Sequence, residues 1–231
     1  MRFRILNGSN ATIFEFQLDN GRNFHQIASD GGFLERPVEM NRLVLGPSER
    51  AEILIDFSDY EEGETVQLAA GDYPFLDFVI DGSRENGYSV PAVLAPIERL
   101  DPAEAAGVRE FVFLGMGADV SINGRQFDRD RIDEFVSLGD TEIWEVSNRS
   151  AMGMMGGTPH PFHAHGTRFQ ILSRNGSRPP ENETGWKDSF VVYPQETVRA
   201  IARFRKPGVF MYHCHILEHE DAGMMGQFQV K

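Results

Sequence analysis

The sequence is poor in residues that cross-link or that carry positive charge. It contains one cysteine, Cys214, in 231 residues, so no disulfide can form within the chain. Its 22 lysines and arginines face 35 aspartates and glutamates, which gives a net charge of -13. Nucleic-acid binding depends on clustered positive charge, so this balance argues against it. The negative charge favours solubility and mildly favours the attraction of cations.

Long hydrophobic runs are also missing. No apolar stretch approaches the roughly 20 residues that a membrane-spanning helix requires, and the first residues do not have the order of a secretory leader. We therefore expect no membrane span and leave the compartment open. The missing leader is uninformative if the chain is part of a longer protein.

Short β-type segments between turn residues fill most of the chain. Together with 12 prolines and 23 glycines, they predict an all-β protein built of sandwiches and not a helical bundle. Turn pairs such as Asn7-Gly8 and Asn20-Gly21 separate the segments. Strands are predicted at 2–6, 13–18, 43–45, 52–57, 66–69, 75–80, 110–114, 142–147, 169–173, 190–193, 198–204, 210–215 and 227–230.

The chain divides into two β units joined by a proline-containing linker. We expect the first unit over 1–83, the linker over 84–108 and the second unit over 109–231. The first unit has no cysteine and one histidine, His25, so we expect it to bind no metal and to act as a structural spacer. His25 is interpreted as a packed or surface residue.

Six of the seven histidines lie in two short segments, HPFHAH at 160–165 and MYHCHILEHEDAGM at 211–224. Side chains alternate faces along an extended strand, so residues two apart share a face. Parity therefore sorts the candidate ligands into two groups on opposite sides of the same strands. The first group is Cys214 with His160, His219 and Met224, and the second is His163, His165, His213 and His215.

The first group has the composition of an electron-transfer site. A thiolate, two imidazoles and a distant thioether are typical of blue copper. A lone buried cysteine is usually a small apolar filler, and a single pair of histidines two residues apart is often a chance surface pair. Two such histidine pairs, one of them enclosing a cysteine and followed by a further histidine and a methionine, are much harder to explain in these ways. The histidines on both sides of Cys214 exceed what an electron carrier needs, and they favour an oxidase.

These residues match the motifs of a known protein family. The chain resembles the bacterial three-domain multicopper oxidases, which include laccases, cuprous oxidases, bilirubin oxidases and spore-coat laccases. The similarity covers nearly the whole chain and is carried by HPFHAHG at 160–166, GWKD at 185–188, YHCHILEHEDAGMM at 212–225, RFRILNGSNA at 2–11, DGGFLERPV at 30–38 and LGPSERAEILIDF at 45–57. It implies tandem cupredoxin-like Greek-key β-sandwiches, the first incomplete and corresponding to the family's metal-free middle domain.

The resemblance also assigns copper ligands. It makes His160, Cys214 and His219 the type 1 ligands, with Met224 as the axial one. It gives His163 to the type 2 copper, and His165, His213 and His215 to the type 3 pair.

Half of the family's trinuclear cluster has no counterpart in this sequence. That cluster takes eight histidines, four of them from two further HxH motifs in an N-terminal cupredoxin domain, and no HxH occurs here before His160. The residues after Met1 also resemble the inside of the middle domain. We therefore expect the chain to be the C-terminal part of a larger or split enzyme, whose N-terminal domain is supplied in cis or in trans.

The implied activity is the one-electron oxidation of small phenolic, amine or cuprous substrates, coupled to the four-electron reduction of O2 to water. Electrons are expected to arrive at the edge of His219 and to pass through Cys214 to its neighbouring histidines. Glu220 matches an acidic position thought to relay protons in some relatives, and a solvated or ligand-orienting role stays equally open. Asp221 is a weaker candidate for orienting a ligand. Asp188 is interpreted as a structural anchor, with substrate contact as the alternative.

Methionines near the site leave a cuprous site conceivable, because thioethers prefer Cu(I). They are Met116 and the run Met152, Met154 and Met155. The long methionine-rich insertion of specialised cuprous oxidases is absent, so a loop at the mouth of the site is the preferred interpretation.

Two alternative functions stay open. The chain could be an isolated type 1 copper module that accepts electrons but cannot reduce O2, or a relative of copper nitrite reductase. The histidines on both sides of Cys214 disfavour nitrite reductase, which needs fewer such ligands.

Overall fold

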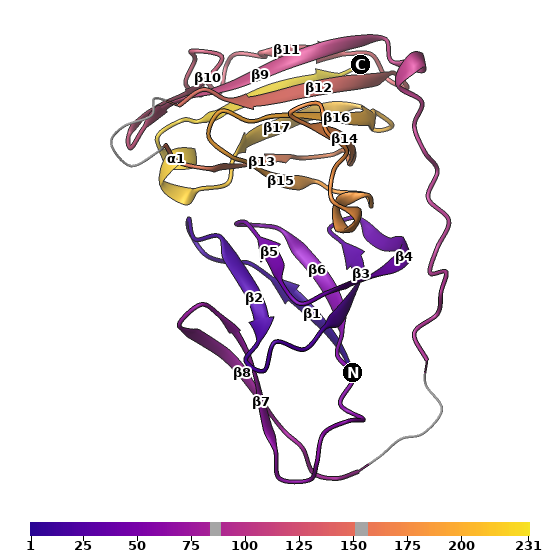
Figure 1. Ribbon diagram of the computed structural model, residues 1–231. Helices are drawn as coiled ribbons and strands as arrows, with labels where there is room; N and C mark the ends of the chain where they lie inside the picture. Colours follow the sequence, from indigo (N-terminus) through magenta and orange to yellow (C-terminus); the bar gives the residue numbers. More distant parts are fainter. Residues whose placement is uncertain (84–88, 151–156) are drawn as a thin grey trace.

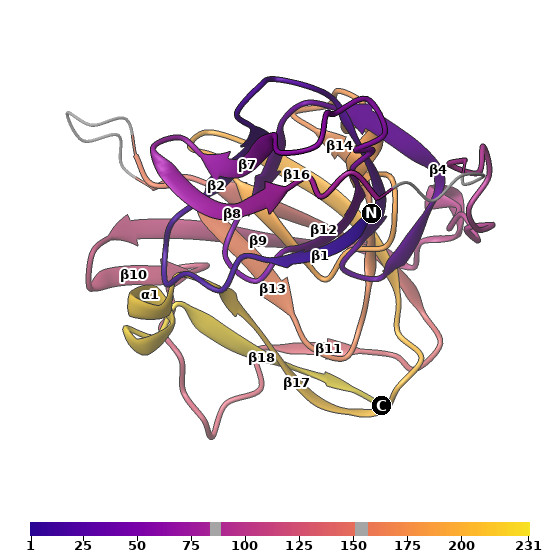
Figure 2. The same cartoon turned by 90° about the horizontal axis from the view of Figure 1, so that it is seen from below.

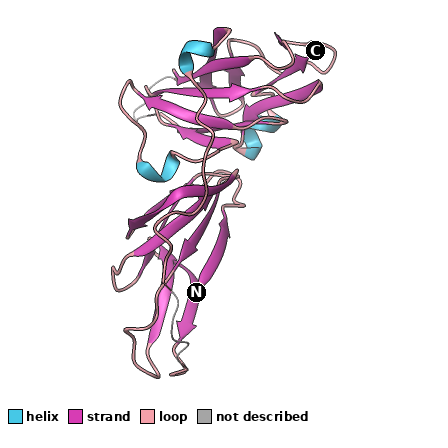
Figure 3. Ribbon diagram, turned by 90° about the vertical axis from the view of Figure 1, so that its right-hand side faces the viewer, coloured by secondary structure: helices cyan, strands magenta, loops and turns pink. Residues whose placement is uncertain are grey.

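The computed structural model describes residues 1–83, 89–150 and 157–231. Its strands form four sheets, two from residues 2–79 and two from residues 107–230. We call these the first and second sandwich. Figure 1 shows one above the other, with the described residues that precede β9 running along one side. Seen from the side, they are stacked end to end (Figure 3).

The first sandwich consists of two four-stranded sheets, ordered β1-β6-β3-β4 and β5-β2-β7-β8. Its core includes Phe16, Phe24, Leu43 and Ile53, which are almost fully buried between the sheets. The strands are β1 (Arg2–Leu6), β2 (Phe14–Leu18), β3 (Phe24–Ser29), β4 (Gly32–Met40), β5 (Leu43–Leu45), β6 (Arg50–Leu54), β7 (Thr65–Ala70) and β8 (Tyr73–Val79).

The second sandwich has two five-stranded sheets, ordered β10-β9-β12-β16-β14 and β11-β18-β17-β13-β15. Its core surrounds Trp144, whose ring contacts Phe111, Phe169 and Phe228. The strands are β9 (Gly107–Met116), β10 (Asp119–Ile122), β11 (Glu134–Val136), β12 (Thr141–Asn148), β13 (His160–Ala164), β14 (Phe169–Arg174), β15 (Ser189–Val192), β16 (Thr197–Arg203), β17 (Gly208–Cys214) and β18 (Met225–Val230).

Helices are few and short. The 3-10 turns η1 (Pro102–Glu104) and η2 (Glu181–Glu183) lie in connections, and α1 (Leu217–Asp221) follows β17 directly. Within the described part of the chain, no helix combines the length and the apolar character needed to cross a membrane. Figure 2, from below, shows α1 at the end of β17, beside the connection that leads into β18.

The segment between the sandwiches is partly packed. Leu94 donates its backbone N–H to the carbonyl of Glu35, and Leu100 is buried against Ile143 and Ile201 of the second sandwich. The described part of the linker predicted over 84–108 therefore contacts both sandwiches, and β9 begins at Gly107, inside the predicted range.

The all-β prediction is confirmed, with all thirteen predicted strands present to within a few residues. Five strands were not predicted: β3, β4, β10, β11 and β13. Strands β3 and β4 pair through a register shift, so they lack the regular alternation that reveals a strand. Strand β13 was missed because strands are recognised by their apolar residues, and this one contains two histidines and a proline.

Candidate metal centres

Two adjacent strands, β13 and β17, carry most of the candidate ligands. They are antiparallel, and Phe162 lies opposite Cys214 while His163 lies opposite His213. Opposite residues project to the same face of a sheet, and their neighbours along the strand project to the other. The register therefore places the Cys214 side chain toward the sandwich core, and His163 and His213 toward its outer face.

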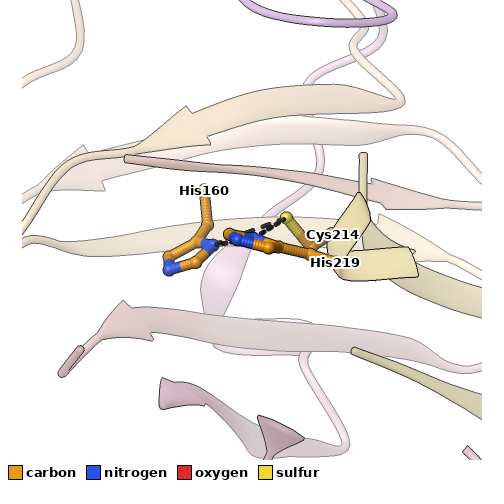
Figure 4. Close-up of side chains that lie close together, drawn as sticks. All are labelled: His160, Cys214 and His219. Atoms are coloured by element: carbon orange, nitrogen blue, oxygen red, sulfur yellow. Dashed lines mark hydrogen bonds between the residues drawn. The ribbon is translucent and has the colours of Figure 1, made fainter. Parts of the chain in front are cut away.

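On the core side, three donor atoms meet in what we call the thiol cluster: His160, Cys214 and His219. The Cys214 Sγ lies 3.5 Å from His160 Nδ1 and 3.7 Å from His219 Nδ1, and the two nitrogens are 3.3 Å apart. All three residues are buried. Figure 4 shows the two imidazoles and the thiol pointing toward one another.

The chain after β17 turns back to deliver His219. Helix α1 begins at Leu217, and the His219 N–H donates to the carbonyl of Ile216. Met224 follows this turn and is fully buried. Its N–H donates to the carbonyl of His219, and its carbonyl accepts from the N–H of Cys214 at 3.0 Å. The backbone thus ties the predicted axial residue to two members of the thiol cluster.

Ser150 orients His160, a role that sequence reasoning missed. Its Oγ lies 2.8 Å from His160 Nε2, and both residues are fully buried. Burial, with a smaller contribution from His219, lowers the pKa of His160 to about 3, so the ring is neutral at pH 7. Metal binding at Nδ1 would require the Nε2–H tautomer, in which Nε2 donates to Ser150 Oγ and the Nδ1 lone pair faces Cys214. No feature of the sequence marks Ser150, because a serine next to a glycine-rich segment is an ordinary loop residue.

On the opposite face lies the imidazole cluster: His163, His165, His213 and His215. The first three place one ring nitrogen each within 4.8 Å of one another. The His215 ring centroid lies 5.4 Å from that of His213 and 5.8 Å from that of His163. His165 Nε2 and His213 Nε2 are 3.2 Å apart. These rings meet on the outer face of the sheet, whereas the thiol cluster lies inside the sandwich.

Backbone carbonyls fix two of these imidazoles. His163 Nδ1 lies 2.9 Å from the carbonyl oxygen of Asp188, and His213 Nδ1 lies 3.0 Å from that of Cys214. A carbonyl only accepts, so each Nδ1 carries the proton and each Nε2 keeps its lone pair. Burial lowers the pKa of His163 to about 4 and also lowers that of His213. Both rings are therefore neutral at pH 7, with Nε2 free to bind a metal.

The donor set fits copper. Thiolate and imidazole together suit copper, and an all-imidazole group also binds it. In the thiol cluster, the Nδ1 atoms of His160 and His219 lie 3.3 Å apart beside the Cys214 Sγ, so a bound cation could contact all three donor atoms. Burial raises the pKa of the Cys214 thiol to about 12, so metal binding has to displace its proton.

The other singled-out residues lie at varied distances from the clusters. Glu220 Oε2 is 3.3 Å from His213 Nδ1, and Asp188 also contacts His163 through its side chain. His25 pairs with Leu54 and Glu39 inside the first sandwich. Met116 is about half exposed at the end of β9. Met152, Met154 and Met155 lie outside the described residues.

A buried thiol and two imidazoles in a β-sandwich define the class of cupredoxin-like copper proteins. Residues 101–231 match the family model described as multicopper oxidase, so the chain belongs to the multicopper oxidase family. Proteins of this family use copper in type 1 and trinuclear sites.

Relatives match over the whole chain. The multicopper oxidase mco of Staphylococcus haemolyticus is 39% identical over all of this chain and 48% of its own length. The laccase of Bacillus subtilis is 34% identical over 97% of this chain and 49% of its own. The crystal structure of a multicopper oxidase from Pediococcus acidilactici superposes with a TM-score of 0.95 at 44% identity, over all of this chain and 48% of that one. The chain thus spans about half the length of the curated relatives it matches.

Proposed function

We propose that this chain is the C-terminal, copper-binding part of an oxidase that couples one-electron oxidation of a small substrate to the reduction of O2 to water. The observation that carries the proposal is the position of Cys214 between His213 and His215. One residue belongs to the thiol cluster and its two neighbours belong to the imidazole cluster. A single short stretch of backbone therefore joins two candidate copper centres.

The ligand assignment follows the two clusters. His160, Cys214 and His219 would hold the type 1 copper with Met224 as axial ligand, His163 the type 2 copper, and His165, His213 and His215 the type 3 pair. Copper supplies one-electron redox chemistry when bound. The chain contributes the geometry, because the core encloses the thiol cluster while Ser150 and backbone carbonyls hold the tautomers in which the ligating nitrogens are free.

The link between the clusters has two parts. The peptide units on either side of Cys214 join it covalently to both neighbouring histidines. In addition, His213 Nδ1 donates to the carbonyl oxygen of Cys214 at 3.0 Å, which adds a hydrogen-bonded link. His213 and Cys214 are the last two residues of β17, which pairs with β13 and β18. Such a link favours electron transfer between centres over storage at either one.

Protons for O2 reduction have a candidate carrier in Glu220. Its carboxylate contacts His213 Nδ1 and its side chain is 30% exposed, so it lies between solvent and the imidazole cluster. His219 is only 7% exposed, and we propose its edge as the point where substrate delivers electrons. The substrate class is small phenols, amines or Cu(I).

The imidazole cluster accounts for only half of a trinuclear site. We propose that the missing histidines come from an N-terminal cupredoxin domain in cis or in trans, which agrees with the half-length coverage of the relatives. We also propose the domain division 1–83 without metal, 84–108 as linker and 109–231 with the copper ligands. Without its partner domain, the chain would act as the alternative, a copper module that turns blue but leaves O2 intact.

Copper loading separates these functions. The copper-loaded chain should turn blue, take up no O2 alone, and oxidise a phenolic dye with O2 uptake once a compatible N-terminal half is added, for example that of the Staphylococcus haemolyticus relative. If the chain showed no blue colour after copper loading, the assignment of the type 1 ligands would be wrong. Consumption of nitrite by the loaded chain would favour the nitrite reductase alternative.

A further inference from the structure

Five charged side chains meet where the two sandwiches contact, and we call them the interdomain ion network: Asp30, Glu49, Arg50, Lys187 and Asp188. The first three come from the first sandwich and its β5–β6 turn, and the last two precede β15. Figure 1 shows the ends of β5 and β6 facing β13 and β15 across this boundary. The network therefore lies next to the strand that carries His163.

The network is largely buried. The Lys187 Nζ lies 3.2 Å from Asp30 Oδ2 and 3.0 Å from Glu49 Oε1, and all three side chains are no more than 5% exposed. Burial alone would lower the pKa of Lys187, but the two facing carboxylates outweigh it and keep the pKa above its usual range. Asp30 Oδ1 also accepts from the backbone N–H of Arg50 at 2.7 Å. Such a pairing of buried charges allows little freedom in how the two sandwiches meet.

Arg50 extends the network to the imidazole cluster. Its guanidinium donates to both carboxylate oxygens of Asp188, at 2.6 and 2.7 Å. Asp188 Oδ1 in turn accepts from the Ser189 hydroxyl at 3.1 Å, and the Asp188 carbonyl accepts from His163 Nδ1 at 2.9 Å. A bidentate arginine–carboxylate pair fixes both position and rotation. Arg50 thus acts on the residue that holds the His163 imidazole.

Ser48 reaches the same imidazole by a second route. Its hydroxyl donates to Ser189 Oγ at 2.7 Å, and Ser189 Oγ lies 2.9 Å from His163 Nδ1. With the Ser189 proton directed to Asp188, its oxygen is left to accept from both Ser48 and His163. Ser48 has a φ of 69°, a conformation that is uncommon for residues other than glycine and that persists where surrounding contacts enforce it.

We propose that Arg50 and Ser48, in the metal-free first sandwich, are positioning residues for His163, holding its Nδ1–H tautomer and ring orientation through Asp188 and Ser189. The first sandwich is then more than a spacer, because it completes the support of a candidate copper ligand in the second. This inference rests on the proposed role of His163 as a ligand. Disrupting the outer support of a metal-bound imidazole commonly costs 10- to 100-fold in metal affinity.

The first experiment needs no metal. Long-range proton–nitrogen NMR on the copper-free chain should show His163 as a single Nδ1–H tautomer whose proton exchanges slowly with solvent. Arg50→Gln should admit the Nε2–H tautomer or speed the exchange by about 5-fold, the equivalent of a hydrogen bond of about 1 kcal/mol, since the Asp188 carbonyl is no longer held. Ser48→Ala should change the exchange in the same direction by less. Arg50→Lys keeps the charge but loses the bidentate geometry, so it should restore the parent behaviour only in part.

The second experiment uses Cu(II) alone as the probe. The first bound equivalent should give the blue colour of the thiol cluster, and electron paramagnetic resonance should then report a second equivalent on imidazole nitrogens. Arg50→Gln should weaken that second equivalent by about 10- to 100-fold and leave the blue band unchanged. The unchanged band also shows that the second sandwich is folded.

Arg168→Gln is the matched control. Arg168 also crosses the boundary, donating to the carbonyl of Gly31 at 3.1 Å, but it does not reach His163. It should leave both readouts within about twofold of the parent. The proposal is overturned if Arg50→Gln and Ser48→Ala both keep the parent tautomer and exchange rate, or if Arg168→Gln changes them equally. If the parent takes up no second equivalent, the ligand role of His163 fails, and the NMR result still decides the positioning role.

Discussion

The thiol cluster and the imidazole cluster use the same two strands but differ in how they are enclosed. The thiol cluster is buried inside the second sandwich, and every contact described for it comes from that sandwich. The imidazole cluster lies on the outer face of the same sheet, and one of its rings is held through residues that contact the first sandwich. The first sandwich therefore supports the two centres differently. It contacts the helix that carries His219 through the Leu217 N–H and the Asn10 carbonyl, and it supports the His163 ring through Arg50 and Ser48.

This difference is a direct result of strand alternation. Successive residues of β17 face opposite sides, so a centre in the core and a centre at a surface are separated by one peptide unit. The core side offers exclusion of water and a fixed ligand geometry. The outer side offers access for further ligands and for a small molecule such as O2. The predictions below test how far the two centres respond separately.

Removing the thiol should have the largest effect. In Cys214→Ser, the blue absorption of the copper-loaded chain should be lost completely, because the intense colour requires a thiolate ligand. Copper on the imidazole cluster should persist, as measured by electron paramagnetic resonance and metal analysis. Met116→Leu is the control, since Met116 is an exposed sulfur residue at the end of β9. A blue Cys214→Ser variant would contradict the assignment of the thiol cluster.

Acid should destabilise the copper-free chain through both clusters. His160 and His163 have folded-state pKa values of about 3 and about 4, mainly because burial disfavours their charged forms. Below their unfolded value of 6.5, the unfolded chain binds protons that the folded chain does not. Each histidine should lower the free energy of unfolding by about 1.4 kcal/mol per pH unit, down to its folded pKa.

Urea unfolding between pH 6.5 and 4.5 measures this slope. His160→Gln should reduce this slope by the contribution of one histidine, about 1.4 kcal/mol per pH unit, because glutamine does not titrate. The contribution of His163 should remain. Met116→Leu provides the control, since Met116 is exposed and does not titrate, so this variant should leave the slope unchanged. An identical slope in His160→Gln and the parent would show that His160 is not held neutral by burial.

Crowding the domain boundary should affect the imidazole cluster selectively. A Cβ added at Gly31 would lie 2.4 Å from Trp186 Cβ and 2.7 Å from its carbonyl oxygen. Gly31→Ala should therefore push the sandwiches apart, cost about 1–3 kcal/mol of stability and weaken copper at the imidazole cluster. Thermal unfolding and copper titration check this. Gly107→Ala, with nothing within 4 Å of the added atom, should be neutral. If the blue band changed as much as copper binding at the imidazole cluster, the domain boundary would affect both centres, and the prediction would be wrong.

Much of this arrangement can be predicted from sequence, because it depends on local periodicity. The positions of Cys214 and its flanking histidines on opposite faces follow from alternation within one strand. The all-β fold follows from short apolar runs between turn residues. The membership of the clusters follows once β13 is taken as extended, although that strand was not among those predicted.

What the sequence could not reveal are contacts between residues distant in the chain. Arg50 and Asp188 are 138 positions apart, and nothing in either segment identifies the other as its partner. The expectation that the first unit is only a spacer considered metal ligands and not the support of a ligand. Asp188 was correctly interpreted as an anchor in the sense that it pairs with Arg50, but its contact with His163 depends on tertiary structure.

The smallest predicted effect is at Ser150, and it is confined to the thiol cluster. Ser150→Ala removes the acceptor for His160 Nε2–H and should cost about 1 kcal/mol in the copper-free chain. The imidazole is then free to rotate or change tautomer, so the blue band should shift or broaden while copper at the imidazole cluster is unaffected. Visible absorption and electron paramagnetic resonance measure both centres in one sample. Ser150→Thr keeps a hydroxyl and should retain more of the parent spectrum than alanine does. If Ser150→Ala changed the imidazole signals as strongly as the blue band, the two centres would share their support, and the contrast between an enclosed and an assembled site would fail.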